Sequence, residues 1–142
     1  MAPLIVLVVV TAVARLAGLQ FEWLDSWPHA VRIGLAAMFL LTASAHFQQP
    51  RRDALIAMVP PRLPAAASLV TLTGVLEAMG AVGLLIPPLA PIAAACLALL
   101  LLTLFPANVR AAHADLGIKT MPLPLRTLVQ AVFLAGCILA AF

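Results

Sequence analysis

Charged residues are scarce in this chain: they make up 9% of its 142 residues, while 65% are hydrophobic. A soluble globular domain carries about 25% charged residues, so the composition argues against that class and indicates a membrane protein. The formal net charge is +3, but the eight Lys and Arg residues are scattered between apolar stretches. A nucleic-acid partner is therefore not expected, because such partners bind clustered basic surfaces.

The sequence also lacks the common metal-binding, phosphate-binding and catalytic motifs. It has no CxxC or HxxxH pair, and His46 and His113 have no Cys or carboxylate at ligand spacing, so no metal site is predicted. It has no glycine-rich phosphate loop, no nucleophile elbow and no evident acid/base pair. No catalytic residue is predicted. Enzymatic activity stays open, and the sequence favours a non-enzymatic protein.

Apolar segments fill most of the chain, each near the ~17–25 residues that a bilayer core requires. Continuous apolar runs such as LIVLVVV favour helices over the alternating strands of a barrel. The sequence predicts an all-α, polytopic transmembrane helix bundle forming a single domain over 1–142, with a four-helix core at 30–142 and an extra N-terminal transmembrane helix and outer loop at 1–29. The first segment is expected to stay uncleaved, since no Lys or Arg precedes its apolar core. The five expected spans are 2–19, 30–47, 66–86, 91–107 and 122–142.

Basic residues outside the spans predict the orientation of the bundle. The connections at 20–29 and 87–90 contain neither Lys nor Arg. By the positive-inside rule, the basic connections are cytoplasmic, which places the N-terminus inside and the C-terminus outside. The residues that carry this prediction are Arg51, Arg52, Arg62, Arg110 and Lys119.

Glu77 stands in the apolar run TLTGVLEAMGAVGLLI, close to the expected midplane. A charge there costs about 2.5–3.5 kcal/mol on insertion scales unless it is paired or protonated. Arg32 is the expected partner and Arg15 the second choice, while Gln130 lies on the polar stripe of the last helix. Two interpretations stay open for this intramembrane polar site: an interhelical contact that fixes packing, or a centre for a ligand, quinone or proton.

A second group of polar residues, His46, Asn108, Arg110 and Arg126, is expected near the cytoplasmic mouth of the bundle. They predict either a binding vestibule or the ordinary polar residues of a membrane interface. The proline-bounded stretch PRRDALIAMVPPRLP predicts a short amphipathic helix in that interface. Pro106 is expected to end or kink the fourth span, because proline lacks a backbone donor. Cys96 and Cys137 are expected to be free, inert thiols.

Four stretches resemble the DoxX family of small bacterial membrane proteins: RIGLAAMFLLTASAHFQQP, AMVPPRLPAAASLVTLTGVLEAMGAVGLLIPPLAP, LLLLTLFPANVRAA and MPLPLRTLVQAVFLAG. The resemblance covers residues 30–142 and implies a four-helix membrane core, to which the helix at 2–19 is an addition. Members of that family include a subunit of a thiosulfate:quinone oxidoreductase and a membrane component associated with oxidative-stress enzymes. The family thus joins several functions on one bundle, and the fold alone does not choose between them.

The resulting expectation is a non-enzymatic accessory or scaffold subunit of the bacterial inner membrane, which holds a lipid-like ligand between its helices. The alternative is a redox-linked subunit that works with a quinone or a soluble thiol/sulfur enzyme, and a small transporter or channel comes third. No cofactor is predicted beyond a quinone or lipid as ligand. The expected partners are membrane lipids and another membrane or soluble subunit.

Overall fold

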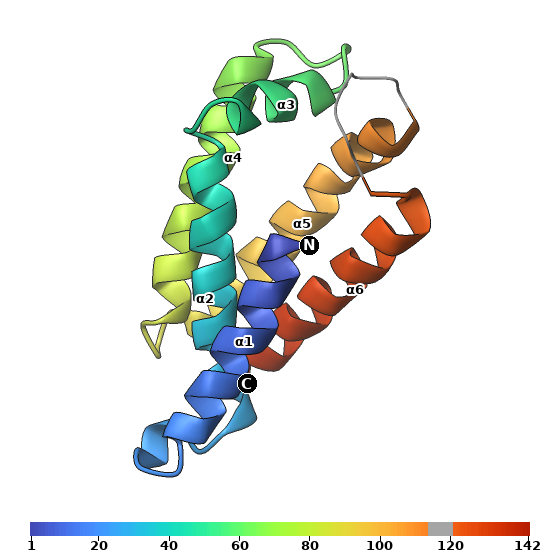
Figure 1. The fold of residues 1–142 in the computed structure, drawn as a ribbon. Helices are drawn as coiled ribbons and strands as arrows, with labels where there is room; N and C mark the ends of the chain where they lie inside the picture. The colour runs from blue at the N-terminus through green and yellow to red at the C-terminus, as the bar shows by residue number, and fades with distance from the viewer. Residues whose placement is uncertain (114–120) are drawn as a thin grey trace.

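Helices build the bundle seen in the computed structural model, which describes residues 1–113 and 121–142 (Figure 1). Four helices are long and apolar enough to cross a membrane: α2 (Trp27–Ala45), α4 (Ala66–Leu84), α5 (Ala90–His113) and α6 (Leu123–Ala140). The predicted all-α transmembrane bundle is confirmed. Its remaining elements are α1 (Ala2–Ala17), the 3₁₀ turn η1 (Glu22–Leu24) and the short helix α3 (Arg51–Met58).

The first helix, α1, is apolar but has 16 residues and is shorter than the other four. At ~1.5 Å per residue it measures about 24 Å, against a hydrocarbon core of about 30 Å. It lies along α2, as Figure 1 shows. Gly34 permits this approach, because a Cβ there would overlap Thr11 Oγ1 and lie 2.9 Å from the carbonyl oxygen of Leu7. The helix at 2–19 is therefore present, and it packs against the core rather than standing apart.

The two ends of the bundle differ. One, called here the η1 end, holds η1, the α4–α5 turn and the C-terminus of α6. The other, the α3 end, holds α3 where it lies across the bundle between the end of α2 and the start of α4. Figure 1 shows α5 and α6 leaning away from α2 and α4 toward the α3 end. The bundle interior is therefore wider at the α3 end.

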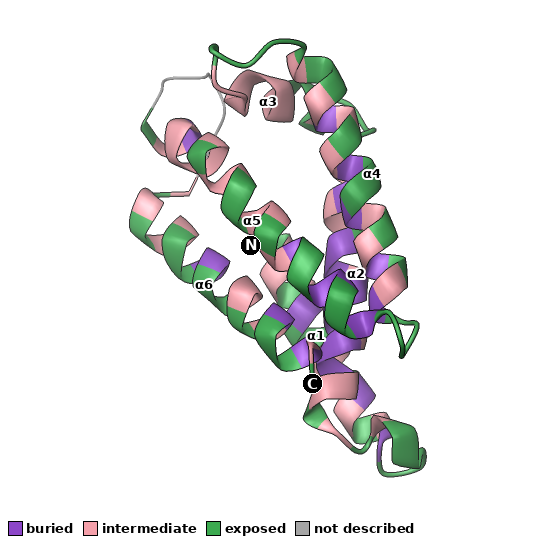
Figure 2. Cartoon of the chain, turned by 180° about the vertical axis from the view of Figure 1, so that it is seen from behind, coloured by how far each residue is buried: buried purple, intermediate pink, exposed green. Residues whose placement is uncertain are grey.

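The central helix is α2, which packs against α1, α4 and α6. The side chains of Leu35, Met38 and Phe39 on α2 are buried with Leu84 of α4 and Leu97 of α5 in one apolar core. Figure 2 shows the buried residues concentrated along α2 and the faces turned toward it, with exposed residues on the outside. Large apolar side chains are common among those exposed residues, as expected for helices that face lipid.

Two local expectations have clear outcomes. The amphipathic stretch forms α3, so the prediction of a short helix there is confirmed. Of the two outcomes expected at Pro106, an end of the fourth span is wrong, because α5 continues through this residue to His113, and a kink stays a prediction. A proline inside a helix removes one hydrogen bond and crowds one preceding carbonyl, and neighbouring helices in a membrane protein can satisfy the group left unpaired.

Candidate functional site: a buried polar cluster beside a hollow

Glu77 lies on the face of α4 that packs against α2, and it is 5% exposed. Its Oε2 accepts a hydrogen bond from Thr42 Oγ1 of α2 at 2.7 Å. Its Oε1 lies 4.0 Å from Nε2 of His46, one helical turn further along α2. The buried carboxylate is therefore held by a hydroxyl and an imidazole from the same helix.

The orientation of His46 follows from its second contact. Its Nδ1 lies 2.9 Å from the carbonyl oxygen of Thr42, and a carbonyl only accepts, so Nδ1 carries a proton. Nε2 then faces Glu77, either with a proton or with a lone pair. At 4.0 Å the two atoms are too far apart for a direct hydrogen bond, so the contact is electrostatic. Glu77 and His46 thus bring two groups that can each carry a proton together inside the bundle.

Gly74 allows this contact by letting α4 approach α2 closely. A Cβ at this position would lie 2.6 Å from Cβ of His46 and 3.0 Å from a ring carbon of Phe47. Small residues at such crossings are typical of membrane helix pairs. The close approach brings the α4 carboxylate within reach of the short side chain of Thr42.

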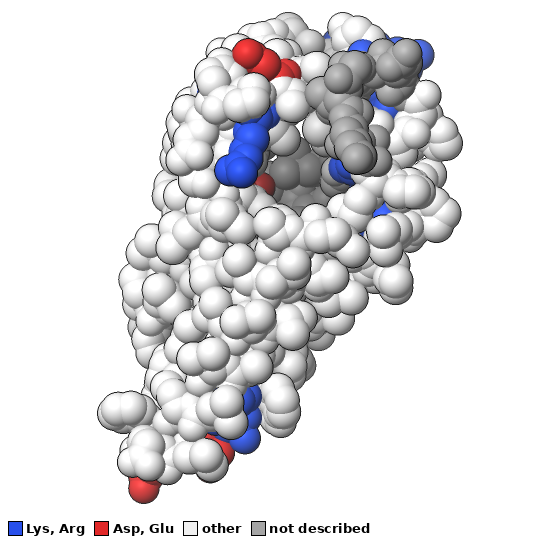
Figure 3. Space-filling view, viewed as in Figure 1, with Lys and Arg blue, Asp and Glu red and all other residues white. Residues whose placement is uncertain are grey.

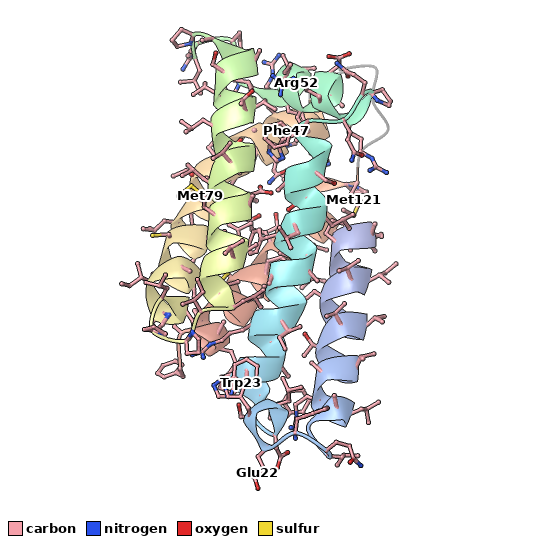
Figure 4. All side chains as sticks on the ribbon, turned by 90° about the vertical axis from the view of Figure 1, so that its left-hand side faces the viewer. Glu22, Trp23, Phe47, Arg52, Met79 and Met121 are labelled. Atoms are coloured by element: carbon pink, nitrogen blue, oxygen red, sulfur yellow. The ribbon has the colours of Figure 1, made fainter. Side chains whose placement is uncertain are left out.

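Arg52 of α3 ties the end of α2 to the start of α4. Its Nη1 donates to the carbonyl oxygen of His46 at 2.6 Å, and its Nη2 donates to Thr71 Oγ1 at 2.9 Å and to the carbonyl oxygen of Ala67 at 3.2 Å. A cation at the C-terminus of a helix satisfies its last carbonyls and interacts favourably with the helix dipole. Figure 4 shows Arg52 and Phe47 together at this end.

The expected pairing of Glu77 with Arg32 is wrong for the described structure. Arg32 is buried near the η1 end, where its Nε donates to the carbonyl oxygen of Ala140 at 2.8 Å. Thr42, which marks the level of Glu77 on α2, lies ten residues further along that helix, or ~15 Å at ~1.5 Å per residue. That separation exceeds the reach of the arginine side chain, and Arg32 instead caps the C-terminus of α6.

The second-choice partner, Arg15, also lies away from Glu77. Its Nη1 contacts Asp25 Oδ1 at 2.9 Å and the carbonyl oxygen of Leu24 at 3.1 Å, which joins α1 to the loop that follows it. The guanidinium also lies 5.2 Å from the ring centroid of Trp27. Arg15 is thus paired with Asp25, a carboxylate of the loop at 20–29.

Polar side chains of α6 contact α5 at two places, one of them involving Gln130, which was expected at the intramembrane polar site. Arg126 Nη1 donates to Asn108 Oδ1 at 2.7 Å, and Gln130 Nε2 donates to the carbonyl oxygen of Leu101 at 2.7 Å. The Nε atoms of Arg110 and Arg126 are buried and have no hydrogen-bond partner in the described part of the chain. Of the remaining residues expected on the cytoplasmic side, His113 is exposed at the end of α5, and Lys119 lies outside the described residues.

Two adjoining pockets open beside the first turn of α1, and Met1 and Pro3 line both. We call these two pockets together the α3-end hollow. The pocket toward α6 has a volume of about 120 Å³ and is lined by Asn108, Arg126 and Gln130 together with apolar side chains. The pocket toward α2 has a volume of about 230 Å³, and Thr42, Ala45 and Arg51 are among its lining residues. Figure 3 shows this face of the molecule hollowed in its upper half, with basic side chains around the opening.

Sequence reasoning missed Thr42 and the role of Arg52. Thr42 precedes His46 by four residues, so both lie on one face of a helix, and this spacing was the available signal. In the sequence, Arg52 supports only the predicted orientation of the bundle in the membrane. Its hydrogen bonds depend on the turn at 46–50, which folds α3 back over the end of α2. His46, expected at the mouth, belongs to the buried cluster instead and is 6% exposed.

Comparison with known proteins places the chain in one family. The family described as "Domain of unknown function (DUF8561)" matches residues 35–138, which is most of the chain, and the protein belongs to it. No curated protein and no solved structure matches the chain. The matched range begins inside α2 and ends inside α6, and it contains Thr42, His46 and Glu77.

Proposed function

We propose that this protein is a non-enzymatic accessory or scaffold subunit of the bacterial inner membrane, which holds an amphipathic, lipid-like ligand in the α3-end hollow. One observation carries the proposal: Arg126, Asn108 and Gln130 line the same small pocket as the apolar side chains of Leu4 and Phe133. Binding sites for small molecules combine apolar walls with a few polar groups that fix orientation. A ligand with a polar head and an apolar body fits that pattern.

The resemblance to the DoxX family is part of this proposal, and so is the orientation. Arg51 and Arg52 on α3 and Arg62 after it lie at the α3 end, whereas the two arginines nearer the η1 end, Arg15 and Arg32, bond to protein groups there. Under the positive-inside rule, the α3 end faces the cytoplasm, with the N-terminus inside and the C-terminus outside. The hollow then opens near the cytoplasmic leaflet.

The proposal is tested by purification in a mild detergent followed by native mass spectrometry of bound lipids, quinones and proteins. Ala45→Phe puts an aromatic ring into the pocket toward α2, where Ala45 is a lining residue. Ala135→Phe makes the same change on the exposed face of α6 and serves as the matched control. The wild-type protein and Ala135→Phe are expected to carry the ligand, and Ala45→Phe to lose it. Wild-type protein without any bound amphiphile would refute the proposal.

The alternative proposal is a redox-linked subunit that works with a quinone or a soluble thiol/sulfur enzyme. The supporting observation is the Glu77–His46 pair, because it places a carboxyl and an imidazole beside Thr42, which lines the hollow. Reduction of a quinone takes up protons, so groups that can carry a proton beside the ligand suit it. The same mass spectrometry separates the two proposals: a bound quinone that is lost in Glu77→Gln favours the redox subunit, and a bound lipid unaffected by this change favours the accessory role.

A further inference from the structure

We propose that the α3-end hollow selects an anionic head group, so that its ligand is an anionic phospholipid. This inference rests on the proposed function, that the hollow holds an amphipathic ligand, and it adds the charge and class of that ligand. It concerns the two arginines of the hollow, Arg51 on α3 and Arg126 on α6.

The charged side chains that line the hollow are basic among the residues that the structure describes. Arg126 lines the pocket toward α6 and Arg51 lines the pocket toward α2, and no described carboxylate is part of either lining. Glu77, the buried acid of the described chain, is engaged by Thr42 and His46. An anion bound in either pocket would therefore meet a guanidinium group and no competing carboxylate from the described lining.

Arg126 retains hydrogen-bonding capacity after its protein contact. A guanidinium has five donor hydrogens, and the partner of Arg126 among the described residues, Asn108 Oδ1, is a neutral amide that leaves the positive charge unbalanced. The Nε atom is buried and has no partner among the described residues. A phosphate group offers oxygens that can accept two parallel bonds from one guanidinium, and it supplies the missing negative charge.

Apolar walls next to the arginines point to a lipid rather than a free anion. Leu4, Val129 and Phe133 line the pocket that holds Arg126, and Leu41 lines the one that holds Arg51. The hollow extends from Arg51, on α3 at the end of the spanning helices, inward to Thr42 of α2 and Phe133 of α6, so it runs from the level of the lipid head groups into that of the acyl chains. An anionic phospholipid places its phosphate at the arginines and its acyl chains against the apolar walls.

The test compares three probes on the full chain in a neutral detergent: dioctanoyl phosphatidylglycerol, dioctanoyl phosphatidylcholine and glycerol 3-phosphate. The variants are Arg126→Gln, Arg126→Lys and, as the matched control, Arg62→Gln, which removes a charge from an exposed position outside both pockets. Affinity is measured by native mass spectrometry titration. The wild type is expected to bind phosphatidylglycerol about tenfold more tightly than phosphatidylcholine, since both lipids offer a phosphate but the choline cation of phosphatidylcholine cancels its net charge and is repelled by the arginines. Arg126→Gln should lose this preference, while Arg126→Lys and Arg62→Gln keep most of it.

The outcomes separate this inference from the proposed function. Equal binding of both lipids, unchanged in Arg126→Gln, would overturn the anionic assignment and leave the amphipathic ligand standing. Binding of neither lipid would overturn both. Glycerol 3-phosphate bound as tightly as phosphatidylglycerol would show a site for a free anion and overturn the lipid assignment. If Arg126→Gln does not fold, Arg51→Gln, at an exposed position, replaces it with the same expected loss.

Discussion

Thr42 Oγ1 lies 2.7 Å from Glu77 Oε2, and this hydrogen bond joins α2 to α4 deep in the bundle. The same hydroxyl lies 3.1 Å from the carbonyl oxygen of Phe39, but it has one proton to donate. With Glu77 ionised, the proton goes to the carboxylate; with Glu77 protonated, the carboxylic acid can donate to the hydroxyl, which then turns to Phe39. The contact thus accommodates both states of the acid without moving either helix.

Thr42→Val is expected to destabilise the folded bundle, because valine keeps the shape but leaves Glu77 without its donor. Hydrogen bonds between membrane helices are worth about 0.6 kcal/mol on average and up to about 1.7 kcal/mol, and a buried carboxylate belongs at the upper end of that range. Thr42→Ser, which keeps the hydroxyl, is the control and should stay near wild type. The free energy of unfolding in mixed micelles measures the difference, and equal stability of the valine and serine variants would contradict the prediction.

Glu77→Ala and Arg32→Ala are expected to be additive in a double-mutant cycle. Arg32 bonds to α6, whereas Glu77 bonds to Thr42, which lies ~15 Å from Arg32 along α2, and distant sites add to within about 0.5 kcal/mol. The cycle of Glu77→Ala with Thr42→Val provides the comparison, and it should show coupling. A coupling energy in the Arg32 cycle larger than in the Thr42 cycle would restore the arginine–carboxylate pair.

The buried face of α2 can be read from the sequence, but its pairing with α4 cannot. Arg32, Phe39 and His46 follow one another at intervals of seven residues, which places them on one face of a helix, and all three are buried. The prediction that Arg32 pairs with Glu77 followed from their opposite charges. The actual partner of Glu77 depends on the axial register of α4 against α2. That register is set by local contacts such as the fit of Gly74 against His46, which no periodicity in one chain reveals.

Gly74→Ala is expected to cost about 1–3 kcal/mol, the usual range for inserting a methyl group into a packed core. The new Cβ would lie 2.6 Å from Cβ of His46, so α4 must move away and Glu77 with it. Gly136→Ala is the matched control, because its Cβ would meet a side-chain carbon of Leu35 at 3.3 Å, a contact that a rotamer change can relieve. Thermal unfolding of both variants in detergent measures the two losses of stability. A larger loss for Gly136→Ala would count against the register of α4 on α2 described here.

Cysteines introduced one at a time into a protein without Cys96 and Cys137 test the orientation. In sealed cells, a membrane-impermeant maleimide should modify position 22 or 88, at the η1 end, and should miss position 62, at the α3 end. The expectation follows from Arg51, Arg52 and Arg62, which the positive-inside rule places in the cytoplasm. All three positions should be labelled once the membrane is permeabilised. Labelling at position 62 in intact cells would reverse the orientation, and with it the leaflet toward which the hollow opens.

Cys96 and Cys137 are expected to differ in reactivity although both are free thiols. Cys96 is exposed and lines an apolar groove of about 540 Å³ between α4 and α5, whereas Cys137 is 1% exposed inside the core. Membrane-permeant N-ethylmaleimide should therefore modify Cys96 in the folded protein at least about tenfold faster than Cys137, because burial blocks the reagent and disfavours the thiolate that reacts.

The two single variants identify which thiol has reacted. Cys96→Ala should remove the labelling of the folded protein, Cys137→Ala should leave it, and both should be labelled alike after unfolding in dodecyl sulfate. Mass spectrometry of the intact chain counts the adducts. Rapid modification of Cys137 in the folded Cys96→Ala variant would show that the core around α6 opens, which the packing of Cys137 with Leu35 and Phe39 in one buried cluster argues against.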